Sequence, residues 1–206
     1  MLTEILIVLL FFGLAWYLLG SNSIPLIDIK DGRKADTLTT KTFTEFSYTC
    51  WIRVDDFTYN EGKPKIIFVK GSADLMHACP ALLLDANTNT LLVKLDTFGS
   101  QETISITSVP SKKWLHVAIC VKEHELNVYV NGVEYAKQSL VNLPKTNTGQ
   151  LLSSPNGGFS GQISKLQFYP RTLTPDEVTT QSTNLPSTNE KEQVFPQYFD
   201  LAWYKP

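Results

Sequence analysis

Apolar side chains recur at every second position through most of the chain beyond residue 41, and this alternation constrains the fold more than any other feature. Five apolar residues occupy alternate positions from Phe46 to Val54, so they share one face of a β-strand. The closely spaced segments, separated by turn residues, predict an all-β protein. Alternation or a short apolar run marks further strands at 66–69, 81–84, 90–95, 104–106, 115–121, 126–130 and 162–169.

Turn and cap signals add detail to this all-β prediction. Asn131-Gly132 separates two apolar segments and predicts a tight hairpin, because both central residues of such a turn take a positive φ. Thr174-Pro175-Asp176-Glu177 has the hydroxyl, proline and glutamate of a helix N-terminus. Eight or more strands with one short, late helix predict a two-sheet antiparallel sandwich.

Composition narrows the classes of function. Charged residues make up 18% of the chain, the formal net charge is -2, and no lysine or arginine cluster offers a phosphate-binding face, so nucleic acid is not expected as a partner. The three cysteines form no CxxC pair, which disfavours a zinc site, and their odd number favours a reducing compartment. The absence of an N-x-S/T sequon points away from the secretory lumen.

Residues 1–20 are predicted to be a transmembrane anchor. The run from Ile5 to Leu19 contains no charged residue; it would span about 22 Å as a helix, and residues 1–3 can extend it toward the ~30 Å hydrocarbon core. A cleaved signal peptide is the alternative, but its start should be basic, whereas this one contains Glu4 and no lysine or arginine. The side chains expected to insert into the bilayer and anchor the chain include Ile5, Leu9, Phe12, Trp16 and Leu19.

The basic residues next to the apolar run indicate its orientation. Lys30, Arg33 and Lys34 follow it and no basic residue precedes it, which places the large domain on the cytoplasmic side of a single-pass protein. The expected organisation is an anchor at 1–20, a linker or first edge strand at 21–41, a sandwich at 42–181, and a polar linker with an aromatic tail at 182–206.

Several motifs resemble a known superfamily. Trp114-Leu-His-Val-Ala-Ile-Cys120, followed by Leu126-Asn-Val-Tyr-Val-Asn-Gly132, resembles the central hairpin of laminin-G-like and pentraxin-like domains of the concanavalin A-like lectin/glucanase superfamily. The segments 46–51, 159–163 and 169–178 are similar to its opening strand, closing strand and short helix. The resemblance covers about residues 37–178 and implies a jelly-roll sandwich. It specifies the fold better than the function.

The resemblance also implies roles for single residues. The large side chains of Trp114 and Tyr129 suit the space between two sheets, and Gly161 would permit a bulge. Pentraxin-type members join these strands by a disulfide, and Cys50 and Cys120 fall near the corresponding positions, with Cys120 one residue out of step. The expected structural residues are Trp51, Trp114, His116, Tyr129, Gly132 and Gly161.

Catalytic residues are not expected. Glucanases of the superfamily carry a Glu-x-Asp-x-x-Glu strand, which is absent from this chain. Glu123 and Glu125 flank a predicted turn, where solvated charges are usual, so they are interpreted as hairpin residues and not as a glycosidase pair. His116 is interpreted as a core histidine. His77 and Cys79 supply only two ligands, which do not make a zinc site.

Calcium is the one cation that the sequence leaves open. Lectin-like sandwiches bind it through loop carboxylates and amides, and the possible donors here are Asp74, Asp85, Asn87 and Asn89. Asp and Asn are also the usual turn formers. No cofactor or metal is therefore predicted, with calcium as the alternative.

The C-terminal segment is dense in aromatic residues. Residues 194–206 contain five of them, and Phe199, Leu201 and Trp203 alternate as on a strand. The segment is either a terminal strand that folds back on the sandwich or a docking peptide for a partner. As a docking peptide it would use Phe195, Tyr198, Phe199 and Trp203.

Three functions follow from these patterns. The first is a non-enzymatic, membrane-anchored binding or scaffolding module that ties a lipid bilayer to a protein assembly. A minor capsid protein at the internal membrane of a large DNA virus would be an example, by analogy only. The second is a membrane-displayed lectin with a glycan ligand, and the third, least favoured, is a glycosidase.

Overall fold

The structure is a computed structural model in which residues 23–186 are described. The predicted anchor at residues 1–20 and the aromatic tail at 194–206 lie outside the described residues. Within residues 23–186, no helix has the length and apolar character needed to cross a bilayer.

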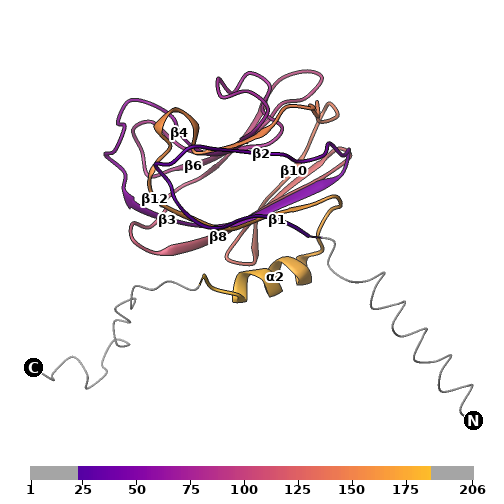
Figure 1. The fold of residues 1–206 in the computed structure, drawn as a ribbon. Helices are drawn as coiled ribbons and strands as arrows, with labels where there is room; N and C mark the ends of the chain where they lie inside the picture. The colour runs from indigo at the N-terminus through magenta and orange to yellow at the C-terminus, as the bar shows by residue number, and fades with distance from the viewer. Residues whose placement is uncertain (1–22, 187–206) are drawn as a thin grey trace, which may run out of the picture.

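Two antiparallel sheets packed face to face make up the described part of the chain, with one α-helix against the outside of the first sheet (Figure 1). In spatial order, sheet A holds β1 (Ile24–Asp31), β12 (Ser160–Tyr169), β3 (Phe46–Asp56), β8 (Trp114–Lys122), β9 (Glu125–Val130) and β10 (Val133–Ser139). Sheet B holds β2 (Asp36–Leu38), β11 (Leu151–Ser153), β4 (Lys65–Lys70), β5 (Ala81–Leu84), β6 (Leu91–Leu95) and β7 (Glu102–Ile106). A short 3-10 turn (Pro155–Gly157) and helix α2 (Pro175–Thr183) complete the fold.

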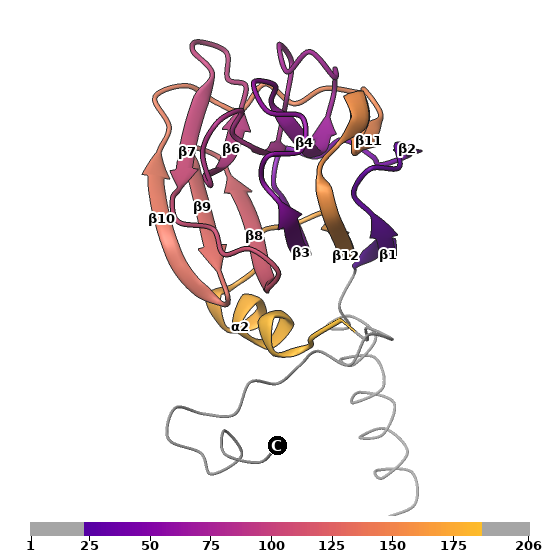
Figure 2. The same cartoon turned by 90° about the vertical axis from the view of Figure 1, so that its left-hand side faces the viewer.

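Figure 2 shows the layers seen toward one end of the strands: sheet B above, sheet A below it, and α2 beneath sheet A. The prediction of an all-β antiparallel sandwich with one short, late helix is confirmed. Strands β1 and β2 lie within residues 21–41, and β1 pairs along its length with β12.

The core between the sheets is built from the alternating positions that the sequence marks. Phe46, Tyr48, Cys50, Ile52 and Val54 of β3 all belong to the main apolar cluster. That cluster also takes side chains from β5 and β6 of sheet B. One face of each sheet is thereby removed from water, which is the main stabilising contribution in such a fold.

The predicted hairpin and helix start are both present. Asn131 and Gly132 have φ values of 50° and 83° between β9 and β10. At the start of α2, the Glu177 backbone N–H donates to the Thr174 hydroxyl at 3.3 Å, and the Thr174 N–H donates to the Glu177 carboxylate at 2.9 Å. Arg171 forms an ion pair with Glu177 at 2.6 Å, and its hydrogen bonds lower the pKa of that carboxyl to about 2.

The expectation that Trp114 and Tyr129 fill the space between the sheets is wrong. In β8, Leu115 and Val117 belong to the core between the sheets, so Trp114 and His116 point to the outside of sheet A, because successive side chains alternate between faces. Tyr129 belongs to a separate cluster on this outer face, which includes residues of α2. The helix buries part of a face that would otherwise be exposed.

The disulfide implied by the resemblance is also contradicted. Cys50 pairs with Val117 across β3 and β8, whereas Cys120 pairs with Ser47. Cys50 lies in the core between the sheets and Cys120 in the cluster under α2. Among the described residues all three cysteines are free and buried. The physical reason is parity, because side chains on opposite faces of a sheet cannot be bridged.

Candidate functional site: a loop face at one end of the sandwich

Three loops meet at one end of the sandwich: 71–80 between β4 and β5, 96–101 between β6 and β7, and 140–150 between β10 and β11. We call their joint surface the loop face. Asp96 donates its backbone N–H to Ala78 at 2.7 Å and accepts that of Lys145 at 2.9 Å. Phe98 donates to the carbonyl of Leu143 at 3.0 Å. These bonds join all three loops.

The loop face carries four of the nine large apolar side chains that the described part of the chain leaves open to solvent. Met76 is 68% exposed, Phe98 73%, Val141 84% and Leu143 47%. Apolar side chains gathered on one surface of a soluble domain mark interaction sites, whereas scattered ones do not. The loop face is therefore the candidate contact surface of the described residues.

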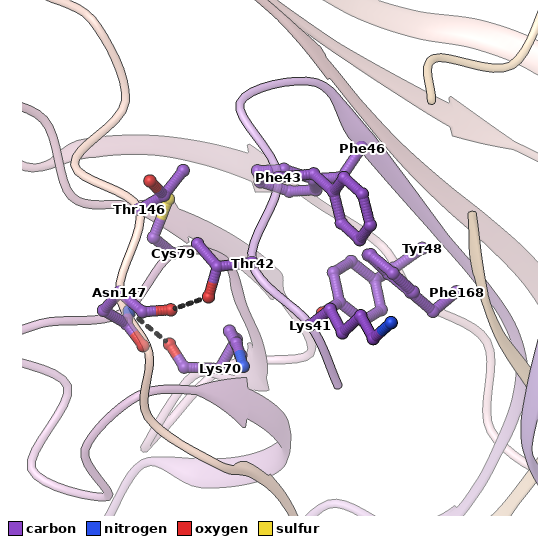
Figure 3. Close-up of a pocket in the computed structure, with 10 residues that line it drawn as sticks. All are labelled: Lys41, Thr42, Phe43, Phe46, Tyr48, Lys70, Cys79, Thr146, Asn147 and Phe168. Atoms are coloured by element: carbon purple, nitrogen blue, oxygen red, sulfur yellow. Dashed lines mark hydrogen bonds between the residues drawn. The ribbon is translucent and has the colours of Figure 1, made fainter. Parts of the chain in front are cut away.

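Asn147 holds the loops in place from within (Figure 3). Its side-chain amide donates to the backbone carbonyl of Lys70 at 3.1 Å, which Figure 3 shows. The same amide donates to the backbone carbonyl of His77 at 2.9 Å. The backbone carbonyl of Asn147 accepts a hydrogen bond from the Thr42 hydroxyl at 2.7 Å. The Asn147 side chain therefore ties the loop 140–150 to the loop 71–80, and its backbone carbonyl ties the same loop to the segment before β3.

Lys70, at the end of β4, is a second residue that holds neighbouring segments in place by hydrogen bonds. It is only 3% exposed, and its ammonium donates to the carbonyls of Thr40 at 2.9 Å and Gly149 at 2.5 Å. Burial lowers the pKa of this lysine. The cost of burying the ammonium is offset by these charge-assisted hydrogen bonds, which fix one end of the loop face.

A small hollow of about 10 Å³, room for about one water molecule, borders the loop face (Figure 3). Its aromatic wall includes Tyr48 and Phe168, whose ring centroids are 4.9 Å apart, and burial raises the pKa of Tyr48. Cys79 and Asn147 of the loop face also line it. None of its ten lining residues is a histidine, an aspartate or a glutamate.

The two metal-ligating candidates in the loop 71–80 do not form a site. The His77 side chain is 63% exposed and its Nδ1 lies 3.6 Å from a carboxylate oxygen of Asp96. Cys79 is buried in the core cluster. No group of three or more His, Cys, Asp and Glu side chains within residues 23–186 could hold a metal ion.

The four possible calcium donors are not brought together. Asp74 lies in the loop face, whereas Asp85, Asn87 and Asn89 lie in the turn at the other end of β5. Asp85 accepts the backbone N–H groups of Asn87 at 3.1 Å and Thr88 at 3.0 Å. Asp74 accepts that of Met76 at 2.9 Å. These bonds lower the pKa of both carboxyls and show that the aspartates act as turn residues.

The two glutamates at the β8–β9 turn, Glu123 and Glu125, lie in the surroundings of an ordinary hairpin turn. Glu123 is exposed with a φ of 46°. Glu125 pairs with Lys137 of β10 at 3.4 Å. Both lie at a hairpin tip and not across a substrate groove.

The expected structural residues lie mostly on the outer face of sheet A. Trp51 is 4% exposed and Tyr129 3% exposed. Trp114 is only half-buried, with the Arg53 guanidinium 5.8 Å from its ring. A Cβ on Gly132 would lie 2.4 Å from the Ser182 hydroxyl of α2, so this glycine permits the close approach of the helix.

His116 is buried beside Trp51 on this outer face. It is 1% exposed, its ring lies 5.2 Å from that of Trp51, and its Nδ1 has no hydrogen-bond partner within residues 23–186. Burial lowers the pKa of the imidazole to about 4.

Acid is therefore expected to destabilise the protein through His116. Its folded pKa of about 4 lies below the ordinary value of 6.5, so the unfolded chain binds the proton first as the pH falls. The free energy of unfolding should fall between pH 6.5 and 4, by about 3 kcal/mol from this group. Urea unfolding across this range should show a smaller decrease in His116→Leu than in the wild type. Equal decreases would contradict a neutral, buried imidazole.

Sequence reasoning missed the loop face. Its apolar side chains stand singly in turn-rich segments, such as Phe98 in Asp-Thr-Phe-Gly-Ser and Val141 in Ser-Leu-Val-Asn-Leu-Pro. An apolar residue amid turn formers was the available signal. The predicted anchor residues and the docking residues of the tail lie outside the described residues.

A family model and several solved structures match this chain. The model, described as the concanavalin A-like lectin/glucanases superfamily and of laminin-G type, matches residues 30–179. The chain belongs to this superfamily. No curated protein matches it.

Among solved structures, the binding domain of Paraclostridial Mosquitocidal Protein 1 is similar at 17% identity and a TM-score of 0.57, covering 79% of this chain and 47% of that one. The receptor binding domain of botulinum neurotoxin D is similar at 11% identity and a TM-score of 0.59, covering 80% and 48%. The binding domain of botulinum neurotoxin DC, solved with rat synaptotagmin II, is similar at 12% identity and a TM-score of 0.54, covering 79% and 46%. This superfamily member thus spans less than half of these chains, and the likeness is one of fold.

Proposed function

We propose that this superfamily member is a non-enzymatic binding module that ties a membrane to a protein assembly. The loop face carries the proposal. It gathers four exposed apolar side chains on loops fixed by hydrogen bonds, and it adjoins a hollow whose lining includes no histidine, aspartate or glutamate. A surface of this kind binds but does not transform a ligand.

The membrane part of the proposal rests on the uncharged run at residues 5–19. A single span there, with Lys30, Arg33 and Lys34 on the cytoplasmic side, would place the sandwich in the cytoplasm or against the internal membrane of a virion. The aromatic tail supplies the protein contact, through Phe195, Tyr198, Phe199 and Trp203. Aromatic residues are enriched where proteins bury one another.

A chain without residues 1–20 is expected to be soluble and folded, because every described strand begins at Ile24 or later. Circular dichroism should show a β-type spectrum for this shortened chain. Vesicle flotation should retain the full chain under alkaline conditions and release the shortened one. Aggregation of the shortened chain, or flotation of both, would contradict a separable anchor.

A membrane-displayed lectin is the second candidate. Phe98 has an exposed ring. The amide nitrogen of Asn142 lies close to the next residue, Gly99, only 2.2 Å from where a Cβ on that glycine would be. The loop face therefore offers an aromatic ring next to a polar group. The similar structures include one whose report states that entry of botulinum neurotoxin type C depends on two ganglioside molecules. A glycan array with the shortened chain separates the two functions, since only a lectin should give reproducible binding to defined sugars. A glycosidase is the least supported reading.

A further inference from the structure

The first strand begins at the same end of the sandwich as the loop face. Ile24 of β1 pairs with Phe168 of β12. Phe168 lines the hollow in Figure 3 together with Cys79 and Asn147 of the loop face. The start of β1 therefore lies next to a strand that borders the hollow, and the loop face borders the same hollow.

The connection from the predicted anchor to this end is short. The uncharged run ends at Leu19, and only residues 20–23 precede Ile24. Four residues reach at most ~14 Å when fully extended. The headgroup layer on each side of a bilayer is about 5–8 Å thick. An anchored chain therefore holds this end of the sandwich against or within a few ångströms of the headgroups.

We infer that the loop face binds the interfacial layer of the same bilayer. This inference rests on the membrane anchor of the proposed function and names the partner of the loop face as phospholipid. Phe98, Val141 and Leu143 enter the boundary between headgroups and acyl chains, where aromatic and aliphatic side chains gain by leaving water. The anchor and the loops then fix the orientation of the sandwich at two places.

The α2 side of sheet A is the competing membrane-facing surface. Its exposed apolar side chains are Leu185, at 59%, and Ile29, at 46%. Ile29 is assigned to this side because it pairs with Ser164, which pairs with Trp51. The exposed part of α2 itself is rich in hydroxyls, including Thr179 and Thr180. The loop face presents more apolar side chains, on three adjoining loops, so it is the favoured surface.

Site-specific fluorescence on the full chain in phosphatidylcholine vesicles tests the inference. The three native cysteines are at most 3% exposed, so a thiol-reactive, polarity-sensitive dye should label an introduced cysteine selectively. Val141→Cys reports on the loop face. Val133→Cys is the matched control, since Val133 is 71% exposed at the opposite end of the strands. Leu185→Cys reports on the α2 side.

The dye at position 141 is expected to shift to shorter wavelengths and to lose intensity when the vesicles carry nitroxide near the headgroups. The dye at position 133 should show neither change. An aqueous signal at 141, or quenching at 185 instead, would overturn the inference while leaving the anchor intact. If the full chain fails to float with the vesicles, the anchor of the proposed function is wrong, and this orientation with it.

Discussion

Replacing Gly161 with alanine is expected to destabilise the sandwich by roughly 3–5 kcal/mol. Gly161 has a φ of 152° in the bulge between β12 and β3, and a Cβ there would lie 1.9 Å from the backbone carbonyl oxygen of Arg53. That oxygen belongs to a central strand and cannot move aside. The free energy of unfolding, measured with denaturant on the chain without residues 1–20, gives the cost.

Gly62→Ala is the matched control. Gly62 also has a positive φ, of 77°, but nothing lies within 4 Å of its Cβ position. The cost should be limited to the backbone preference, about 1 kcal/mol. Similar losses in the two variants would show that the close approach of Arg53 to Gly161 is not a constraint on the fold.

Replacing Trp51 with alanine is expected to cost about 3–5 kcal/mol. Trp51 is 4% exposed and packs on His116, so truncation removes a large buried ring and leaves a cavity. Trp114→Ala should cost clearly less, because this ring is half-buried. Denaturant midpoints of the two variants should fall in that order, and the reverse order would contradict the packing of the outer face of sheet A.

The alternation of apolar residues was sufficient to predict much of the fold. In β3 and β8 it identifies the face that packs between the sheets, as for Ile52 and Val117. It could not show that the other face is also buried. Cys120 and Tyr129 are covered by α2, and Ile66 and Val69 of β4 by the loop 71–80. Coverage of this kind depends on segments distant in sequence.

The loop face could not be predicted from the sequence, because it too depends on contacts between segments that are distant in the chain. Met76, Phe98 and Val141 come from three loops, and nothing local shows that these loops meet. Their meeting depends on long-range bonds such as that from Phe98 to Leu143. The possible calcium donors show the same limit of local sequence, since Asp74 and Asp85 share a residue type but lie at opposite ends of β5.

Co-purification of the full chain from its native membrane in mild detergent is the most direct test of the central claim, the tie between a membrane and a protein assembly. We expect the chain to elute in a defined complex with another protein. The double substitution Phe199→Ala with Trp203→Ala should release the chain from that complex, whereas Val133→Ser should not. Elution of the unchanged chain alone, with its fold intact and no protein partner in stoichiometric amount, would contradict the account.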